Sequence, residues 1–129
     1  MKLLLDAHAL LWWLSGDSRL GRRARAAIVD PSNFVFVSAA TAWEIAVKRA
    51  LGKLGAPGDI DDWLVQNNFR PLPIQIAEAV AAAELPLHHR DPFDRLLVAQ
   101  ARMGGMTIVT IDANISKYDV PVLAVDDRA

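Results

Sequence analysis

The chain has 129 residues, 53% of them hydrophobic, which suits one compact domain spanning residues 1–129 with a substantial core. It contains no cysteine, which excludes disulfides, thiolate zinc sites and cysteine nucleophiles. The formal net charge is −1, so a nucleic-acid ligand would have to be attracted by local basic patches or by metal ions.

No stretch approaches the roughly 20 apolar residues that a membrane-spanning helix needs. The apolar run Leu3–Leu5 is interrupted by Asp6 and His8, and no small-residue cleavage site follows, so a signal peptide is not indicated. We therefore predict a soluble, cytoplasmic protein without a membrane partner. The absence of cysteine agrees with a reducing compartment.

In the first part of the chain, short apolar runs predict strands and longer periodic segments predict helices. Leu3–Leu5 is typical of a buried strand that ends at Asp6, and Leu10–Leu14 of a helix packed on the sheet. Ser18 resembles the N-cap of a second helix with apolar residues at helical spacing. A turn then leads into a strand at Phe34–Val37.

The middle of the chain predicts mainly helices. In chain order, the expected elements are a helix capped by Ser38 and running to about Leu51, a helix capped by Asp59 and running to about Asn67, a short edge strand at Arg70–Pro73, and a helix from Ile76 to Leu85.

The last part begins with a strong helix start, because Asp91 is a natural N-cap and Pro92 suits the first helical position. This helix runs to about Met103, before two glycines end it. A strand at Thr107–Ile111 and a short one at Val120–Val125 follow.

Strands that alternate with helices indicate a parallel α/β sheet covered on both faces. In such folds, ligands bind beyond the carboxyl ends of the strands. Asp6 and Asp112 each follow a predicted strand at that edge.

Each acidic residue has an ordinary interpretation when it is taken alone. Asp6 and Asp94 suit helix starts, and Asp112 suits a turn. Glu44 lies six residues after Ser38 in a predicted helix, where a solvated face is the simplest interpretation.

Together, however, these four acids indicate a metal site. Four carboxylates cannot share a small pocket as bare anions, because their repulsion would raise their pKa values. Oxygen ligands without cysteine favour Mg²⁺ or Mn²⁺ over Zn²⁺. Such a cation activates water and stabilises charge on a phosphodiester.

Four segments, in order along the chain, carry a resemblance to PIN-domain ribonucleases, and most closely to the VapC-type toxins of bacterial toxin–antitoxin pairs. They are Leu3–Trp12, Ser38–Ile45, Arg90–Ala101 and Val109–Asp112. The third segment is the most specific. The resemblance implies a three-layer α/β sandwich with a central, mostly parallel five-stranded sheet.

The resemblance also implies that Asp6, Glu44, Asp94 and Asp112 form the acidic quartet of a Mg²⁺-dependent endoribonuclease. Asp6 and Asp94 would be the firmest metal ligands. Asp112 would complete the site, directly or through water, and Glu44 would assist the metal or the attacking water.

Neighbouring residues take lesser roles by the same resemblance. Asp91 is assigned to capping, and Ser38 and Thr110 would be hydroxyls beside the ligands. Ala7 stands where many relatives have threonine or serine. Members of the family act on RNA, usually form homodimers and are inhibited by a cognate antitoxin.

Other polar and aromatic residues admit two interpretations. His88 and His89 fit no standard metal motif and are predicted in a surface loop, while Arg95 is expected to pair with Asp91. Basic residues either contact RNA or lie on solvated helix faces: Arg22, Arg23, Arg25, Lys48, Arg49 and Lys53. The tryptophans either stack on bases or, as we expect, pack in the core or an interface: Trp12, Trp13, Trp43 and Trp63.

Two other classes of protein compete with a nuclease. A phospho-receiver or haloacid-dehalogenase-type phosphatase also has an aspartate after its first strand. The receiver needs an acidic pair that the segment before Asp6 lacks, and the phosphatase needs an aspartate where His8 stands. A non-catalytic domain of the same fold is disfavoured because all four acids are present.

Overall fold

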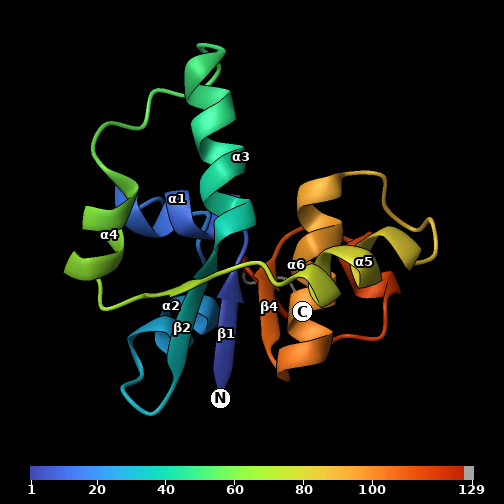
Figure 1. Ribbon diagram of the computed structural model, residues 1–129. Helices are drawn as coiled ribbons and strands as arrows, with labels where there is room; N and C mark the ends of the chain where they lie inside the picture. The colour runs from blue at the N-terminus through green and yellow to red at the C-terminus, as the bar shows by residue number, and fades with distance from the viewer. Residues whose placement is uncertain (127–129) are drawn as a thin grey trace.

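The computed structural model describes residues 1–126, and within them five parallel strands form one sheet in the order β3-β2-β1-β4-β5 (Figure 1). The strands are β1 (Lys2–Leu5), β2 (Phe34–Ser38), β3 (Arg70–Leu72), β4 (Thr107–Thr110) and β5 (Val122–Ala124). The helices are α1 (Ala7–Ser15), α2 (Arg22–Val29), α3 (Ala39–Ala50), α4 (Ile60–Gln66), α5 (Ile76–Glu84) and α6 (Pro92–Gly104), with a 3₁₀ turn η1 (Ile115–Lys117). The predicted α/β sandwich is therefore confirmed.

The central strand β1 shows how the sequence builds two cores. Leu3 and Leu5 belong to one buried cluster, whereas Leu4 belongs to a second cluster. Successive side chains of a strand point to opposite faces, so one continuous apolar run serves both faces of the sheet. Helices α1, α2 and α4 contribute to the first cluster, and α6 contributes to the second.

Figure 1 shows how the helices lie with respect to the carboxyl ends of the strands. Helix α3 continues upward from the end of β2, and the first turn of α6 lies at the same end of the sheet. This edge therefore receives side chains from the ends of β1 and β4 and from the starts of α1 and α6.

Side-chain caps begin several helices as the sequence predicts. Asp6 Oδ1 accepts the Ala9 N–H at 2.8 Å, Asp91 Oδ1 accepts the Phe93 N–H at 2.8 Å, and Ser38 and Asp59 cap α3 and α4. These contacts satisfy amide groups that a helix start leaves unpaired. The predicted edge strand at Arg70–Pro73 is also confirmed, as β3 at the sheet edge.

The predicted cap at Ser18 is wrong, because α2 begins only at Arg22 with Gly21 as its N-cap. Asp17 accepts the Arg19 N–H at 2.9 Å and so forms a local turn where the helix was expected. The Gly21 N–H donates to the Val125 carbonyl at 2.8 Å. This contact joins the residue before α2 to the segment after β5.

Within residues 1–126, none of the helices has the length and apolar character needed to cross a membrane. The longest, α6, has 13 residues and carries charged side chains in its first and last turns.

Candidate active site

The four predicted acids come from four separate places and lie at the carboxyl edge of the sheet. Asp6 directly follows β1, and Asp112 lies two residues after β4. Asp94 occupies the first turn of α6, and Glu44 lies in α3, which follows β2. The chain topology thus explains why residues so distant in sequence gather.

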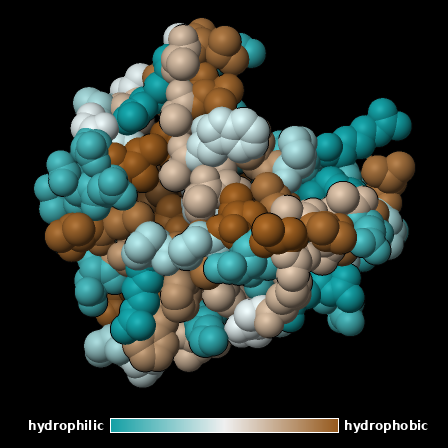
Figure 2. Space-filling model, viewed as in Figure 1, coloured by the Kyte–Doolittle hydropathy of each residue, from teal (hydrophilic) through white to brown (hydrophobic). Residues whose placement is uncertain are grey.

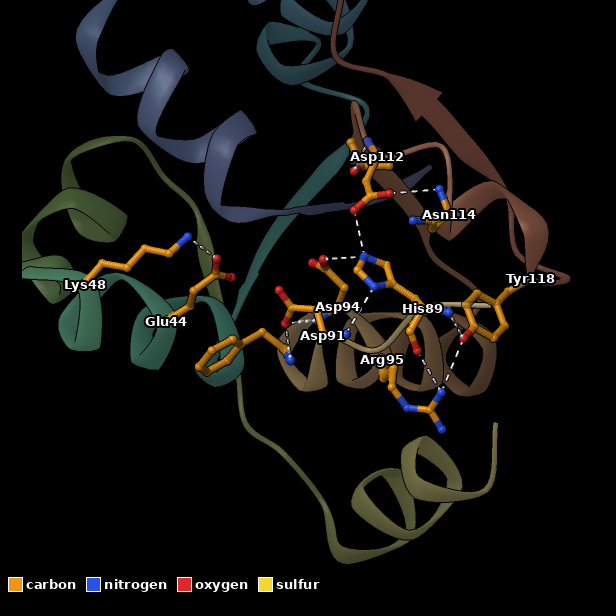
Figure 3. A network of polar contacts seen from close by, with 11 residues as sticks. Glu44, Lys48, His89, Asp91, Asp94, Arg95, Asp112, Asn114 and Tyr118 are labelled. Atoms are coloured by element: carbon orange, nitrogen blue, oxygen red, sulfur yellow. Dashed lines mark hydrogen bonds and ion pairs between the residues drawn. The ribbon is translucent and has the colours of Figure 1, made fainter. Parts of the chain in front are cut away.

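Asp94 and Asp112 meet on either side of His89 (Figure 3). The His89 Nε2 atom lies 2.7 Å from Asp112 Oδ2 and 3.0 Å from Asp94 Oδ2. One ligand atom from each of the three residues lies within 4.8 Å of the others. The imidazole is 13% exposed and the Asp94 side chain 15%, so the contact is shielded from most solvent.

Asp6 is the most buried of the four acids, at 5% exposure. Burial raises the pKa of its carboxyl, and the nearby charge of Glu44 acts in the same direction. Hydrogen bonds from the Thr110 side chain and from the Ala9 amide oppose that shift. The Asp6 carboxylate is therefore fixed in position by donors from two elements.

The pKa of Asp94 is raised by its burial and by the carboxylates around it. Burial and the charges of Asp91, Asp6 and Glu44 together raise the pKa of Asp94 to about 7, whereas His89 lowers it. At neutral pH this group binds a proton readily unless a positive charge comes near it. A cation close to Asp94 would relieve this repulsion.

Glu44 is 7% exposed, so the solvated-face interpretation of this residue is wrong. Its Oε2 accepts from Lys48 Nζ at 2.7 Å, one helical turn later. This ion pair raises the pKa of Lys48. In Figure 3, the pair lies beside the Asp94–His89 contact and not within it.

Three other sequence predictions have mixed outcomes. Asp91 caps α6 as expected. The Thr110 hydroxyl lies beside the acids, because it bonds Asp6 and accepts the Asp112 N–H at 3.0 Å. The Ser38 hydroxyl instead donates to the buried Gln100 Oε1, so this side chain joins α3 to α6 and does not serve the acids.

The expectations for the α5–α6 loop are confirmed only in part. Both histidines lie in this loop and His88 is exposed, but the His89 side chain is only 13% exposed. The Arg95 guanidinium does not pair with Asp91 but donates to backbone carbonyls of the loop and of α5: those of Ala82, Ala83, Leu85, Pro86 and His89. Arg95 therefore holds the loop that carries His89.

A groove of about 1340 Å³ lies beside the acids, between α1 and the segment that leads from α3 into α4. Apolar and aromatic residues line it, among them Leu11, Leu14, Leu54, Trp12 and Trp63, and three basic residues contribute as well: Arg19, Lys48 and Lys53. Lys48 belongs to this lining and pairs with Glu44, so the groove adjoins Glu44 through this lysine.

The tryptophans divide between the two interpretations. Trp13 packs on Phe69 and donates its indole N–H to Asn67 Oδ1 at 2.9 Å, as expected of a packing residue. Trp12 lies under the Arg19 guanidinium, 4.5 Å from the ring centroid. Trp43 is 60% exposed on α3 and makes an edge contact with Phe93, so it does not pack in the core, and packing in an interface stays a prediction for this residue.

The comparisons with known proteins agree with the fold. The sequence model of the PIN domain matches residues 3–121. The chain is 30% identical to ribonuclease VapC22 of Mycobacterium tuberculosis over 122 residues, which cover 92% of this chain and 93% of that protein. The chain therefore belongs to the PIN-domain family, and the predicted resemblance to VapC-type ribonucleases is confirmed.

Solved structures show the same fold at lower identity. The VapBC2 complex of Rickettsia felis, bound to a promoter DNA fragment, has a chain that matches with a TM-score of 0.66 and 10% identity, over 95% of this chain and 98% of that one. A toxin–antitoxin complex from Klebsiella pneumoniae matches with a TM-score of 0.63 and 18% identity, over 95% and 96% of the two chains.

Proposed function

We propose that this protein is a metal-dependent endoribonuclease, and that Asp6, Asp94, Asp112 and Glu44 form its active site. The observation that carries the proposal is the convergence of these acids from four elements on one edge of the sheet. The mutual repulsion around Asp94 supports a cation as their natural counter-charge. The identity to a ribonuclease supports RNA as the substrate.

The donor set fits Mg²⁺, with Mn²⁺ as an alternative, because carboxylate oxygens are the ligands these hard cations prefer. Asp6, Asp94 and Asp112 would hold the ion. The bound cation supplies an activated water and stabilises charge on the phosphodiester.

Hydrogen bonds within the chain orient the acids for this reaction. The Ala9 amide and Thr110 orient Asp6, and the Asn114 N–H fixes Asp112 by donating to its Oδ1 at 2.8 Å. Lys48 holds the Glu44 carboxylate, which is then placed to orient or deprotonate a water molecule. No covalent nucleophile is needed.

We further propose that the protein is the toxin of a toxin–antitoxin pair and that a segment of the antitoxin binds in the groove beside α1. The solved structures of similar fold are toxin–antitoxin complexes, which supports such a partner. The apolar lining suits apolar side chains of that segment, and Lys53 suits a neighbouring acidic one. Lys53→Glu should weaken antitoxin binding measured by calorimetry, whereas Lys117→Glu on η1 should not.

A homodimer is the third part of the proposal. Figure 2 shows hydrophobic residues gathered on the face that carries α5. Ile76 is 85% exposed at the start of this helix, and Val80 is exposed one turn later. Exposed apolar patches of this kind commonly mark interfaces. Ile76→Lys should yield monomers in light scattering. Val65→Lys changes a similarly exposed apolar residue on α4 and should leave the dimer intact.

The nuclease proposal is tested by incubating the purified protein with mixed RNA and Mg²⁺, with and without EDTA. We expect cleavage that EDTA abolishes and that Asp94→Asn removes. Asp61→Asn, an equal charge change on the exposed start of α4, is the matched control and should cleave normally. Cleavage that ignores EDTA or survives Asp94→Asn would contradict the mechanism. Metal binding without cleavage would favour a non-catalytic domain.

A further inference from the structure

His89 occupies a central position between two of the proposed metal ligands. Its Nε2 atom contacts Asp94 and Asp112, which belong to different elements, at 3.0 and 2.7 Å. No other histidine of the described chain shares a group of potential metal ligands with these acids. The ring thus links α6 to the segment after β4 by contacts that lie within the acidic cluster (Figure 3).

The second ring nitrogen determines what His89 can do there. The Asp91 backbone N–H points at Nδ1 at 3.1 Å. A backbone amide can only donate, so Nδ1 carries a lone pair and the ring proton is on Nε2. A histidine that ligates a metal normally shows the opposite pattern, because its second nitrogen donates to a carboxylate, a carbonyl or water. In this arrangement, the His89 Nε2–H donates hydrogen bonds to the acids, and the Nδ1 lone pair is taken by the Asp91 N–H, so neither nitrogen offers a lone pair to a metal.

The two oxygens of the Asp112 carboxylate have different partners. Its Oδ1 accepts the Asn114 N–H at 2.8 Å, and its Oδ2 is the atom that His89 contacts. The Nε2–H thus lies between Asp94 Oδ2 and Asp112 Oδ2, at 3.0 and 2.7 Å from them. A cation that joins these two oxygens needs the same position, and the partial positive charge of the N–H repels it there.

The backbone around His89 is held independently of its ring. The His89 N–H donates to the Tyr118 hydroxyl at 3.0 Å, and its carbonyl accepts from Arg95 at 3.1 Å. The Tyr118 hydroxyl in turn donates to the Pro86 carbonyl at 2.6 Å. The ring can therefore turn away about its own side-chain bonds while the loop stays in place.

We propose that His89 is a built-in competitor of the metal ion: its imidazole bonds the oxygens of Asp94 and Asp112, and a divalent cation must displace it to bind there. This inference rests on the metal site of the proposed function. It assigns to a loop residue the control of metal affinity. With its ring inserted, the Nε2–H occupies the two carboxylate oxygens through hydrogen bonds; with its ring displaced, these oxygens are free to hold the cation.

Removal of the ring should therefore tighten metal binding. His89→Ala deletes the imidazole and keeps both backbone contacts, so the loop should keep its fold. Displacing the ring costs about one hydrogen bond to a charged group, so we expect the Kd for Mn²⁺ to fall about tenfold. His89→Gln retains an N–H that can reach the carboxylates, and its Kd should lie between those of the two proteins.

The test is a titration with Mn²⁺ alone, without RNA and at one fixed pH, in which electron paramagnetic resonance measures the free ion. His88→Ala is the matched control, because His88 is the adjacent, exposed histidine. Tighter binding by His89→Ala, with His88→Ala unchanged, is the expected result. Weaker binding would show that His89 is a ligand, and equal binding would show that it does not compete; either overturns the inference.

The same experiment separates this inference from the proposed function. If neither the unaltered protein nor His89→Ala binds Mn²⁺, both the metal site and the competition are contradicted. If both bind it equally and RNA is cleaved, only the competition fails. Nitrogen-15 spectra of the imidazoles give a second readout: His89 should carry its proton on Nε2 without metal, and Mg²⁺ should shift its signals and leave those of His88 in place.

Discussion

Asp6 and Glu44 are each held by a partner from the helix that follows or carries them, whereas Asp94 and Asp112 share the ring of His89, which comes from a loop. The Ala9 amide holds Asp6 through the start of α1, and Lys48 holds Glu44 from the next turn of α3. His89 comes from a loop and bonds through a side chain that can turn. One half of the acidic site is thus set by secondary structure, and the other half is adjustable.

This difference has a physical basis in where the repulsion is concentrated. Burial and the charges of Asp91, Asp6 and Glu44 raise the pKa of Asp94, and His89 opposes them. The Asp94 carboxylate is therefore favoured when a hydrogen-bond donor or a cation lies against it. His89 and a metal ion are alternative partners for this carboxylate.

The largest expected effect comes from the adjustable half. Asp94→Asn keeps the shape of the side chain but removes its charge, so the cation loses a ligand. Because metal catalysis supplies several kcal/mol, kcat/KM for RNA should fall on the order of 10³-fold. Steady-state cleavage of a labelled RNA measures this, with Asp61→Asn as the control. A loss below tenfold would contradict the role of Asp94.

The next effect concerns stability without metal. Since the pKa of Asp94 is raised from 3.8 to about 7, the folded protein binds more protons than the unfolded chain between these values. Stability in EDTA should therefore fall as the pH rises through this window and change little above it. We expect Tm to drop by about 5 °C between pH 5 and pH 8.

Asp94→Asn should flatten this dependence, because the substituted side chain does not ionise. A smaller slope will remain, since burial also raises the pKa of Asp6. Thermal unfolding of the two proteins across the pH range gives the comparison. Identical slopes would show that Asp94 does not carry the repulsion.

Asp91 lies beside the site but should behave as a cap. Asp91→Ala removes the acceptor for the Phe93 amide, which should lower the free energy of unfolding by about 1 kcal/mol. Cleavage should stay within a few-fold of normal. Chemical denaturation and the RNA assay measure the two effects, and a loss of activity like that of Asp94→Asn would instead place Asp91 among the ligands.

The smallest effect is expected in the fixed half. Lys48→Met breaks the ion pair with Glu44, and because the lysine is partly exposed we expect a loss of only about 0.5 kcal/mol in unfolding free energy. Cleavage should fall about twofold. Lys53→Met is the control for the loss of a lysine in the same groove. A far larger loss for Lys48→Met would indicate that this lysine contacts RNA directly.

The sequence predicted those parts of the site that local structure determines. Asp6, Asp91 and Asp94 follow from strand ends and helix starts, and Asp112 from the end of β4. These signals depend only on neighbouring residues. The parallel sheet follows from the alternation of apolar runs and helices, because each run can be buried only between two helical layers.

The remaining features depend on contacts between distant elements. Helix periodicity left Glu44 on a solvated face, and its burial depends on α1 and α6, which pack against α3. His89 reaches the acids because its loop is held by Tyr118, 29 residues further along the chain, and by Arg95 in α6. A histidine two residues before the cap of α6 was the only available signal, and spacing alone did not reveal its role.

The most direct test of the four acids as one cation site is a crystal structure of the protein with Mn²⁺, located by its anomalous scattering. Our account predicts a peak within about 2.2 Å of carboxylate oxygens of Asp94 and Asp112, with Asp6 at the same site and the His89 ring turned away. A protein that cleaves RNA with Mn²⁺ but shows no peak among these carboxylates would contradict it.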